Sequence, residues 1–91
     1  MALDIQHARG TQQFKVVVDG VTCVLDYLLF ETTMRITHTG VPAAVGGRGI
    51  AGELVRTALD YARSRGWRVE LACSYAEVWV ERHPAYQDLV A

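Results

Sequence analysis

The chain has 91 residues, of which 51% are hydrophobic and 21% are charged. This composition is typical of one small globular domain over residues 1–91 and excludes a disordered chain. Nine basic and ten acidic side chains give a net charge of -1, so we expect neither a nucleic acid nor a membrane as a partner, because both require a dense basic face.

The chain begins with the polar stretch MALDIQHARG, which lacks the apolar core of a signal peptide. The longest apolar run, residues 21–30, contains Thr22 and Asp26 and is too short to cross a bilayer, which takes about 20 residues. These features predict a cytoplasmic protein in which Cys23 and Cys73 are free thiols. The cysteines and histidines show no metal-ligand spacing, so we expect no metal.

Three antiparallel strands are expected in the first half of the chain. Residues 14–18 (FKVVV) and 21–30 (VTCVLDYLLF) are rich in β-branched and aromatic side chains, and Asp19-Gly20 between them favours a tight hairpin turn. Residues 34–38 (MRITH) alternate and form a third strand, with Met34, Ile36 and His38 on one face.

The second half of the chain predicts a helix, a strand and a second helix. Apolar residues recur every three to five positions from Ile50, and Gly66 lies just past the expected end of this helix. Residues 67–73 (WRVELAC) predict a buried strand, and residues 76–83 (AEVWVERH) a short helix ended by Pro84. The fold class is therefore α+β: antiparallel strands, then a β-α-β crossover and a short C-terminal helix.

A glycine-rich loop, VGGRGIAG at residues 45–52, precedes the first helix. No Ser, Thr, Asp or Asn precedes the helix to cap it, so its first N–H groups lack a local acceptor. Glycines allow a ligand to approach, and the helix dipole with Arg48 favours an anion such as pyrophosphate. In the alternative, water caps the helix and the glycines only form the turn. The loop is neither a P-loop nor a dinucleotide-binding GxGxxG motif.

Four segments in and around this loop resemble a minimal GNAT-like family of acyl-CoA N-acyltransferases. They are residues 38–42 (HTGVP, similar to HTEVP), 46–51 (GGRGIA, similar to the (Gln/Arg)-x-x-Gly-x-(Gly/Ala) acyl-CoA signature), 71–75 (LACSY, similar to a cysteine segment) and 83–89 (HPAYQDL, similar to HPEYxDL). The chain departs from the family at Gly46, which replaces Gln or Arg, and at Gly40, which replaces a glutamate.

The resemblance implies a shortened GNAT fold with acetyl-CoA, or a related acyl-CoA, in a gap of the sheet. It implies pantetheine along the end of the third strand and pyrophosphate on the N–H groups of the loop. The implied binding residues are Thr39, Gly40, Val41, Gly46, Gly47, Arg48, Gly49, Ile50 and Ala51. Arg56 and Arg63, about two turns apart on the helix, are candidates for the adenosine 3′-phosphate, although exposed arginines on helices usually bind nothing specific.

Two residues are candidates for catalysis. The resemblance implies that Cys73 lies near the acyl group, as a nucleophile, a positioning group or a proton donor to the leaving CoA thiolate; the alternative is an inert buried thiol. His38 is the general-base candidate by residue type; the alternative is a core histidine that holds the following turn. In a direct-attack mechanism, water or Tyr75 is the alternative to His38 for removing the proton of the amine.

The sequence therefore predicts an N-acetyltransferase that moves an acetyl group from CoA to an unidentified amine acceptor. Because Gly40 replaces the family glutamate, a catalytically inactive CoA-binding module is the alternative. An interaction domain that binds no ligand at this loop is the third hypothesis.

Overall fold

The computed structural model describes residues 3–91 and contains a five-stranded sheet in the order β1-β2-β3-β4-β5. The strands are β1 (Gln6–Ala8), β2 (Gln13–Val18), β3 (Val21–Phe30), β4 (Thr33–Gly40) and β5 (Arg68–Leu71). Strands β1 to β4 are antiparallel neighbours, whereas β5 runs parallel to β4. A parallel neighbour requires a crossover connection, which here is supplied by the first helix.

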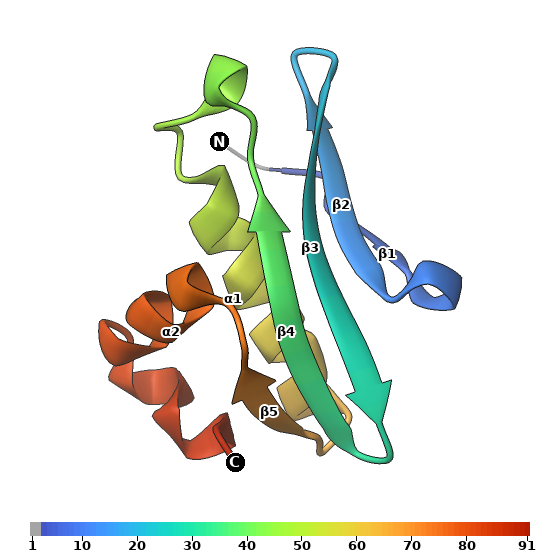
Figure 1. Cartoon of the computed structure of the whole chain (residues 1–91), viewed down its shortest axis with the longest axis vertical. Coiled ribbons are helices and arrows are strands. Elements are labelled where there is room, and N and C mark those ends of the chain that lie inside the picture. Colours follow the sequence, from blue (N-terminus) through green and yellow to red (C-terminus); the bar gives the residue numbers. More distant parts are fainter. Residues whose placement is uncertain (1–2) are drawn as a thin grey trace.

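Two α-helices and three short 3₁₀ segments complete the fold. The helices are α1 (Ile50–Ser64) and α2 (Ser74–Glu81), and the 3₁₀ segments are η1 (Arg9–Thr11), η2 (Ala43–Val45) and η3 (Pro84–Leu89). Figure 1 shows α1 behind the sheet, with α2 and the C-terminal segment beside β5. The expected α+β class and the β-α-β crossover are confirmed. None of the described helices is long and apolar enough to cross a membrane.

The core lies between α1 and the sheet. The apolar side chains of α1 that recur along the sequence are at most 1% exposed: Ile50, Leu54, Val55, Ala58, Leu59 and Ala62. They meet the inward side chains of the strands, among them Phe14, Val16, Cys23, Leu25, Met34, Ile36 and Val69. The burial of this helical face fixes the position of α1, and with it the loop that precedes the helix.

The elements differ from the expectation by one additional strand and at several boundaries. A first strand, Gln6–Ala8, was not expected because it is short and begins with two polar residues; it pairs through its backbone with β2, and the His7 ring stacks on Phe14 at 4.1 Å. Strand β5 ends at Leu71 rather than at Cys73, because the chain leaves β4 there. Helix α2 begins at Ser74, two residues before the expected start.

One irregularity in β4 reverses the expected side-chain alternation. Tyr27 of β3 lies opposite Ile36, and the preceding residue Asp26 lies opposite His38, so Thr37 is an extra residue that forms a bulge. A bulge of one residue moves the following side chains to the other face of the sheet. His38 therefore does not share a face with Ile36, contrary to the expectation.

The C-terminal segment HPAYQDL, which contains η3, packs against the two helices. The His83 ring stacks on Trp79 at 3.7 Å, and the Tyr86 hydroxyl donates to Asp60 at 2.8 Å. The Asp88 carboxylate accepts two hydrogen bonds from Arg63, at 2.9 and 3.0 Å. Beyond η3, the N–H of Ala91 donates to Val69 O at 2.8 Å and covers the outer edge of β5. The chain end is thus docked, as its apolar side chains predict.

Replacing Leu54 by Ala tests the packing of α1. Leu54 is fully buried, so the substitution removes apolar contacts, leaves a cavity and lowers the free energy of unfolding by about 2–5 kcal/mol. Urea denaturation measures this change. Val78→Ala is the control, since Val78 is 45% exposed and the change should cost less than about 0.5 kcal/mol. Equal effects of the two substitutions would contradict this account of the core.

Candidate functional site

Strands β4 and β5 part midway along β4. Their last paired residues are Ile36 and Leu71, and the N–H of Ala72 donates to Ile36 O at 2.9 Å. Strand β4 continues to Gly40 but from there on pairs only with β3. One backbone edge of β4 thus has no strand beside it within residues 3–91, and the chain after β5 turns into α2 next to that edge. Unpaired strand edges offer N–H and C=O groups to a ligand.

The loop before α1 presents a helix start that no side chain caps. Gly49 is the N-cap in the left-handed conformation, with φ 77°, which favours glycine. Within the described chain, no backbone acceptor bonds the N–H groups of Ile50, Ala51 and Gly52. Nothing lies within 4 Å of the position that a Cβ would take at Gly47 or Gly49. Free N–H groups and open space at a helix N-terminus suit an anion.

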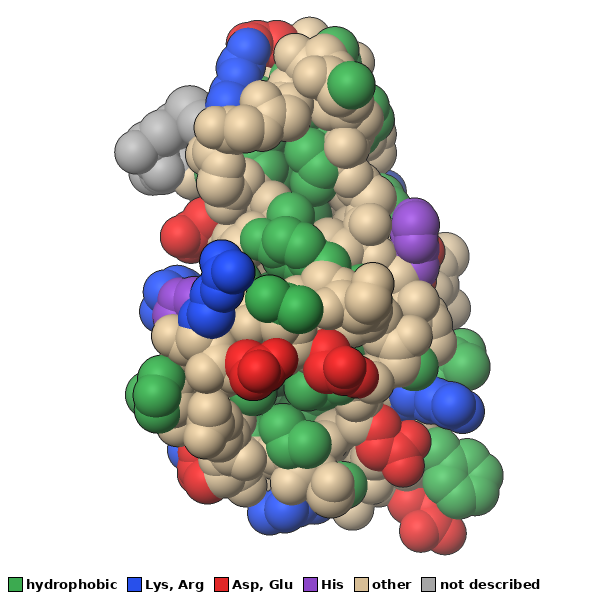
Figure 2. Space-filling model, turned by 60° about the vertical axis from the view of Figure 1, so that its left-hand side comes forward, with side chains coloured by type: hydrophobic (Ala, Val, Ile, Leu, Met, Phe, Trp, Pro, Cys, Tyr) green, Lys and Arg blue, Asp and Glu red, His purple; other side chains and the backbone are tan. Residues whose placement is uncertain are grey.

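A hollow of about 340 Å³ joins this loop to the end of β4 and to α2. Its lining consists of Val41, Gly46, Gly47, Gly49, Ile50, Ala51 and Tyr75. Six of these seven residues belong to the segments expected to bind acyl-CoA, and Tyr75 comes from the first turn of α2. Figure 2 turns this side toward the reader and shows hydrophobic side chains between the loop and α2.

Arg48 is placed differently from its neighbours in the loop. Its guanidinium Nη1 bonds Asp19 Oδ2 at 2.6 Å, in the turn between β2 and β3, and both side chains are exposed. Arg48 does not line the hollow, although its backbone N–H remains part of the loop. The fixed positive charge expected beside the helix start is therefore paired with a carboxylate.

Cys73 lies at the N-terminus of α2 and contacts the end of β4. It is the N-cap residue, and its Sγ is 3.4 Å from the Thr39 hydroxyl oxygen. Partial burial raises the pKa of the Cys73 thiol. Hydrogen bonds from the Thr39 hydroxyl and from the backbone N–H groups of Ala76, Tyr75 and Thr39 lower this pKa by more than burial raises it. The pKa of Cys73 is therefore lowered, because these donors stabilise the thiolate. Burial and the neighbouring Cys73 raise the pKa of Tyr75.

His38 lies on the other face of β4. Thr39 is opposite Leu25, which is fully buried, whereas His38 is opposite Asp26 on the outer face. His38 is exposed rather than a core histidine. A Cβ at Gly40 would stand 3.0 Å from His38 Nε2, so a glutamate here would require the imidazole to move. The structure therefore brings Cys73 to Thr39 and not to His38.

Of the two arginines considered as ligands of the adenosine 3′-phosphate, Arg63 is already hydrogen-bonded to the C-terminal segment. Its guanidinium binds Asp88 and the carbonyl of Ala85. Arg56 lies over the Trp79 ring at 5.3 Å and donates to the Tyr86 hydroxyl at 3.3 Å. Both side chains thus hold the C-terminal segment against α1.

Two contacts of the site carry no signal in the sequence. The pairing of Cys73 with the Thr39 hydroxyl joins residues 34 positions apart. Gly52 faces Trp79, whose Nε1 would be 3.2 Å from a Cβ at that position. A glycine in the first turn of α1 thus lets α2 approach closely, and no local pattern indicates that requirement.

The chain is similar to known proteins over nearly its whole length. The sequence profile of GCN5-related N-acetyltransferases matches residues 13–89. Protein NATD1 of Xenopus tropicalis is 33% identical over 91 residues, 97% of this chain and 84% of that protein. NATD1 of Homo sapiens is 34% identical over 88 residues, 93% and 78% of the two chains. The solution NMR structure of a GCN5-like protein from Staphylococcus aureus matches with a TM-score of 0.77 and 26% identity, over 98% and 88% of the two chains.

Alkylation of Cys73 by iodoacetamide tests the environment of its thiol. Because the pKa of Cys73 is lowered, its alkylation rate should rise with pH at a lower midpoint than that of a cysteine in an unstructured peptide. Thr39→Val removes a donor and should shift the midpoint to higher pH, while Thr39→Ser should not. Mass spectrometry reports the site, and the fully buried Cys23 should stay unlabelled until the protein unfolds. An unchanged midpoint in Thr39→Val would remove the assigned role of the hydroxyl.

Proposed function

Because the chain belongs to the GCN5-related N-acetyltransferase family, we propose that it binds acetyl-CoA, or a related acyl-CoA, and transfers the acyl group to an amine. The observation that carries this proposal is the uncapped start of α1, whose hollow extends to the free end of β4. The acyl-CoA is a co-substrate here, and the acceptor is an amine of unidentified structure.

The loop fits a pyrophosphate by its backbone rather than by its side chains. Nothing lies within 4 Å of the Cβ positions of Gly47 and Gly49, which leaves room for a pyrophosphate to approach the N–H groups of residues 47–51. The helix dipole adds a favourable potential. Because Arg48 is paired with Asp19, we assign the anion to the N–H groups. The free edge of β4 at Thr39 to Val41 would hold the amide groups of pantetheine, which need donors and acceptors in register with a strand.

Cys73 is the residue to which we assign the transfer. A lowered pKa makes the thiolate available as a nucleophile and disfavours the same group as a proton donor. The Cys73 sulfur would form a bond with the acyl carbon as the bond to the CoA sulfur breaks and the CoA thiolate leaves. The amine would then attack this acyl carbon, lose one proton to water and release the Cys73 thiolate.

A CoA-binding module without transferase activity is the second candidate function. Gly40 and His38 favour it: the His38 Nε2 atom lies only 3.0 Å from the position where the Cβ of a family-type glutamate would be, and His38 lies on the face of β4 away from Cys73. None of the described residues that line the hollow carries a carboxylate. Steady-state release of CoA thiol with a panel of amines distinguishes a transferase from such a module.

Ala51→Glu tests whether acetyl-CoA binds at the loop. A ligand at 100 times its Kd stabilises the folded state by about 2.7 kcal/mol, which should raise the Tm of the wild-type protein by about 10 °C or more. Ala51 lies in the first turn of α1 and lines the hollow. A glutamate there interacts favourably with the helix dipole but repels a pyrophosphate. The Tm without ligand should therefore stay equal or rise, while the rise in Tm caused by acetyl-CoA disappears.

The matched control is Ala85→Glu in η3, which adds the same charge at an exposed position outside the hollow and should retain the full shift. Substitution of Gly49 is less informative, since its positive φ would add backbone strain to any loss of binding. If acetyl-CoA raises the Tm of neither the wild-type protein nor Ala85→Glu, both the transferase and the binding module are excluded.

Incubation with acetyl-CoA without an acceptor tests the role of Cys73. We expect intact-mass spectrometry to show one acetyl group on Cys73, which hydroxylamine removes and Cys73→Ala lacks. Cys73→Ala should still show the rise in Tm with acetyl-CoA, because the loop is unchanged. A wild-type protein that releases CoA thiol with amines but never carries the acetyl group would exclude the nucleophile and favour direct attack by the amine.

A further inference from the structure

The sheet has one open face, opposite to the face that α1 covers (Figure 1). Near the turn between β3 and β4, this face carries Phe30, which is 76% exposed, and Leu28, which is 54% exposed. Single exposed apolar residues are common on protein surfaces. These two lie two positions apart on one strand, where side chains share a face, so they form a small apolar patch on this face. Exposed apolar patches are candidates for interaction sites.

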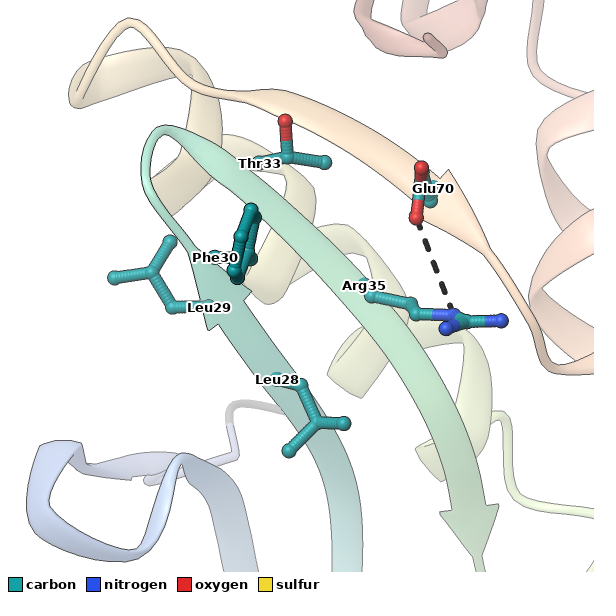
Figure 3. A pocket seen from close by; sticks show the side chains of 6 residues that line it. All are labelled: Leu28, Leu29, Phe30, Thr33, Arg35 and Glu70. Atoms are coloured by element: carbon teal, nitrogen blue, oxygen red, sulfur yellow. Dashed lines mark ion pairs between the residues drawn. The ribbon is translucent and has the colours of Figure 1, made fainter.

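The patch borders a hollow of about 360 Å³ that extends across three strands. Its lining consists of Leu28, Leu29, Phe30, Thr33, Arg35 and Glu70. Leu28 lies opposite Arg35, and Arg35 lies opposite Glu70, so the three form one row across the sheet. Figure 3 shows this row, with the apolar side chains on β3 and the two charged side chains on β4 and β5.

The two charged groups of the row are only loosely paired with each other. Arg35 Nε and Glu70 Oε1 are 3.9 Å apart, and the side chains are 58% and 54% exposed. A guanidinium has five donors and a carboxylate several acceptor sites, so most of the bonding capacity of both groups is unused within residues 3–91. One positive and one negative group beside an apolar patch make a surface that is complementary to its own copy.

A two-fold contact between two such faces satisfies both charges and both apolar side chains. In a two-fold interface, residue i contacts residue j of the other copy, and residue j contacts residue i. Arg35 of each copy would then meet Glu70 of the other, and Phe30 would enter the hollow beside Leu28 of the other. A patch that matches itself in charge favours a second copy over an acidic or a basic partner.

The size of the face and the charge of the chain allow this contact. The molecule measures 34 × 30 × 21 Å, and the sheet forms one of its broad sides. A stable interface needs about 800 Å² per partner, which such a side can supply. The net charge is only -1, so repulsion between two copies is weak.

From this juxtaposition of Phe30, Leu28, Arg35 and Glu70, we propose that the chain forms a symmetric dimer through the open face of its sheet. The face lies at the end of β4 opposite to the glycine-rich loop, so both candidate acyl-CoA sites stay open in the dimer. The dimer does not rest on the proposed function, and its test needs no ligand.

Sedimentation equilibrium over a range of micromolar protein concentrations measures the dimer. We expect a monomer–dimer equilibrium for the wild-type protein and at least about a tenfold weaker dimer for Phe30→Asp and for Leu28→Lys, since central apolar residues dominate interfaces. Val78→Asp is the control, because Val78 is also an exposed apolar residue but lies on α2. A wild-type protein that is monomeric at every concentration overturns the proposal.

A mixing experiment then tests the contact between Arg35 and Glu70. Arg35→Glu alone and Glu70→Arg alone each place like charges across the two-fold contact and should be monomeric. An equimolar mixture of the two variants restores opposite charges at both contacts and should form a heterodimer. An intramolecular role of the ion pair would not produce this recovery.

The mixture of Arg82→Glu with Glu81→Arg controls for general attraction between oppositely charged chains. These residues are exposed at the end of α2, and the mixture should associate no more tightly than the wild-type protein. If the mixture of Arg35→Glu and Glu70→Arg remains monomeric, or if the two control variants dissociate the dimer as strongly as Phe30→Asp does, the open face is not the interface.

Discussion

The arrangement of the candidate site depends on how β4 ends. The strand is held on both sides as far as Ile36, then gains the extra residue Thr37 and loses β5 as a neighbour. The bulge turns Thr39 toward the interior and His38 outward. The parting of the strands leaves a free edge beside which α2 begins, with Cys73 against Thr39. Without the extra residue, the imidazole and not the hydroxyl would face the interior at this end of the strand.

The second half of the site depends on the packing of α1. Six apolar side chains bury one face of this helix on the sheet, and this burial fixes the uncapped N-terminus beside the free end of β4. The C-terminal segment supports the helix from its other side, through Arg63 and Asp88 and through Tyr86. The motif HPAYQDL therefore has a structural role here. It forms η3, which packs on α2, and Cys73 lies at the N-terminus of α2.

Most of the fold was predictable, because it follows from local patterns. The hairpin at Asp19-Gly20 has positive φ at both turn residues, 50° and 75°, as its type requires. The spacing of apolar residues in α1 matches its buried face. Strand β1 could not be predicted, because it has only three residues, two of them polar, and shows no strand pattern. The contacts that hold it, the pairing with β2 and the stacking of His7 on Phe14, come from another segment of the chain. The early start of α2 could not be predicted either, since Cys73 rather than a strong cap residue precedes it.

By itself, the sequence determined the order of the strands and helices from β2 onward, the β-α-β crossover, the uncapped glycine loop and the family resemblance of four segments. These features depend on periodicity, turn chemistry and the absence of cap residues, all of which are local. Only the tertiary structure decided which side chains meet. The bulge at Thr37, the pairing of Cys73 with Thr39, and the engagement of Arg48 by Asp19 arise from contacts between distant segments. The open face with Phe30 and Arg35 was decided there too, because exposure depends on what the rest of the chain covers.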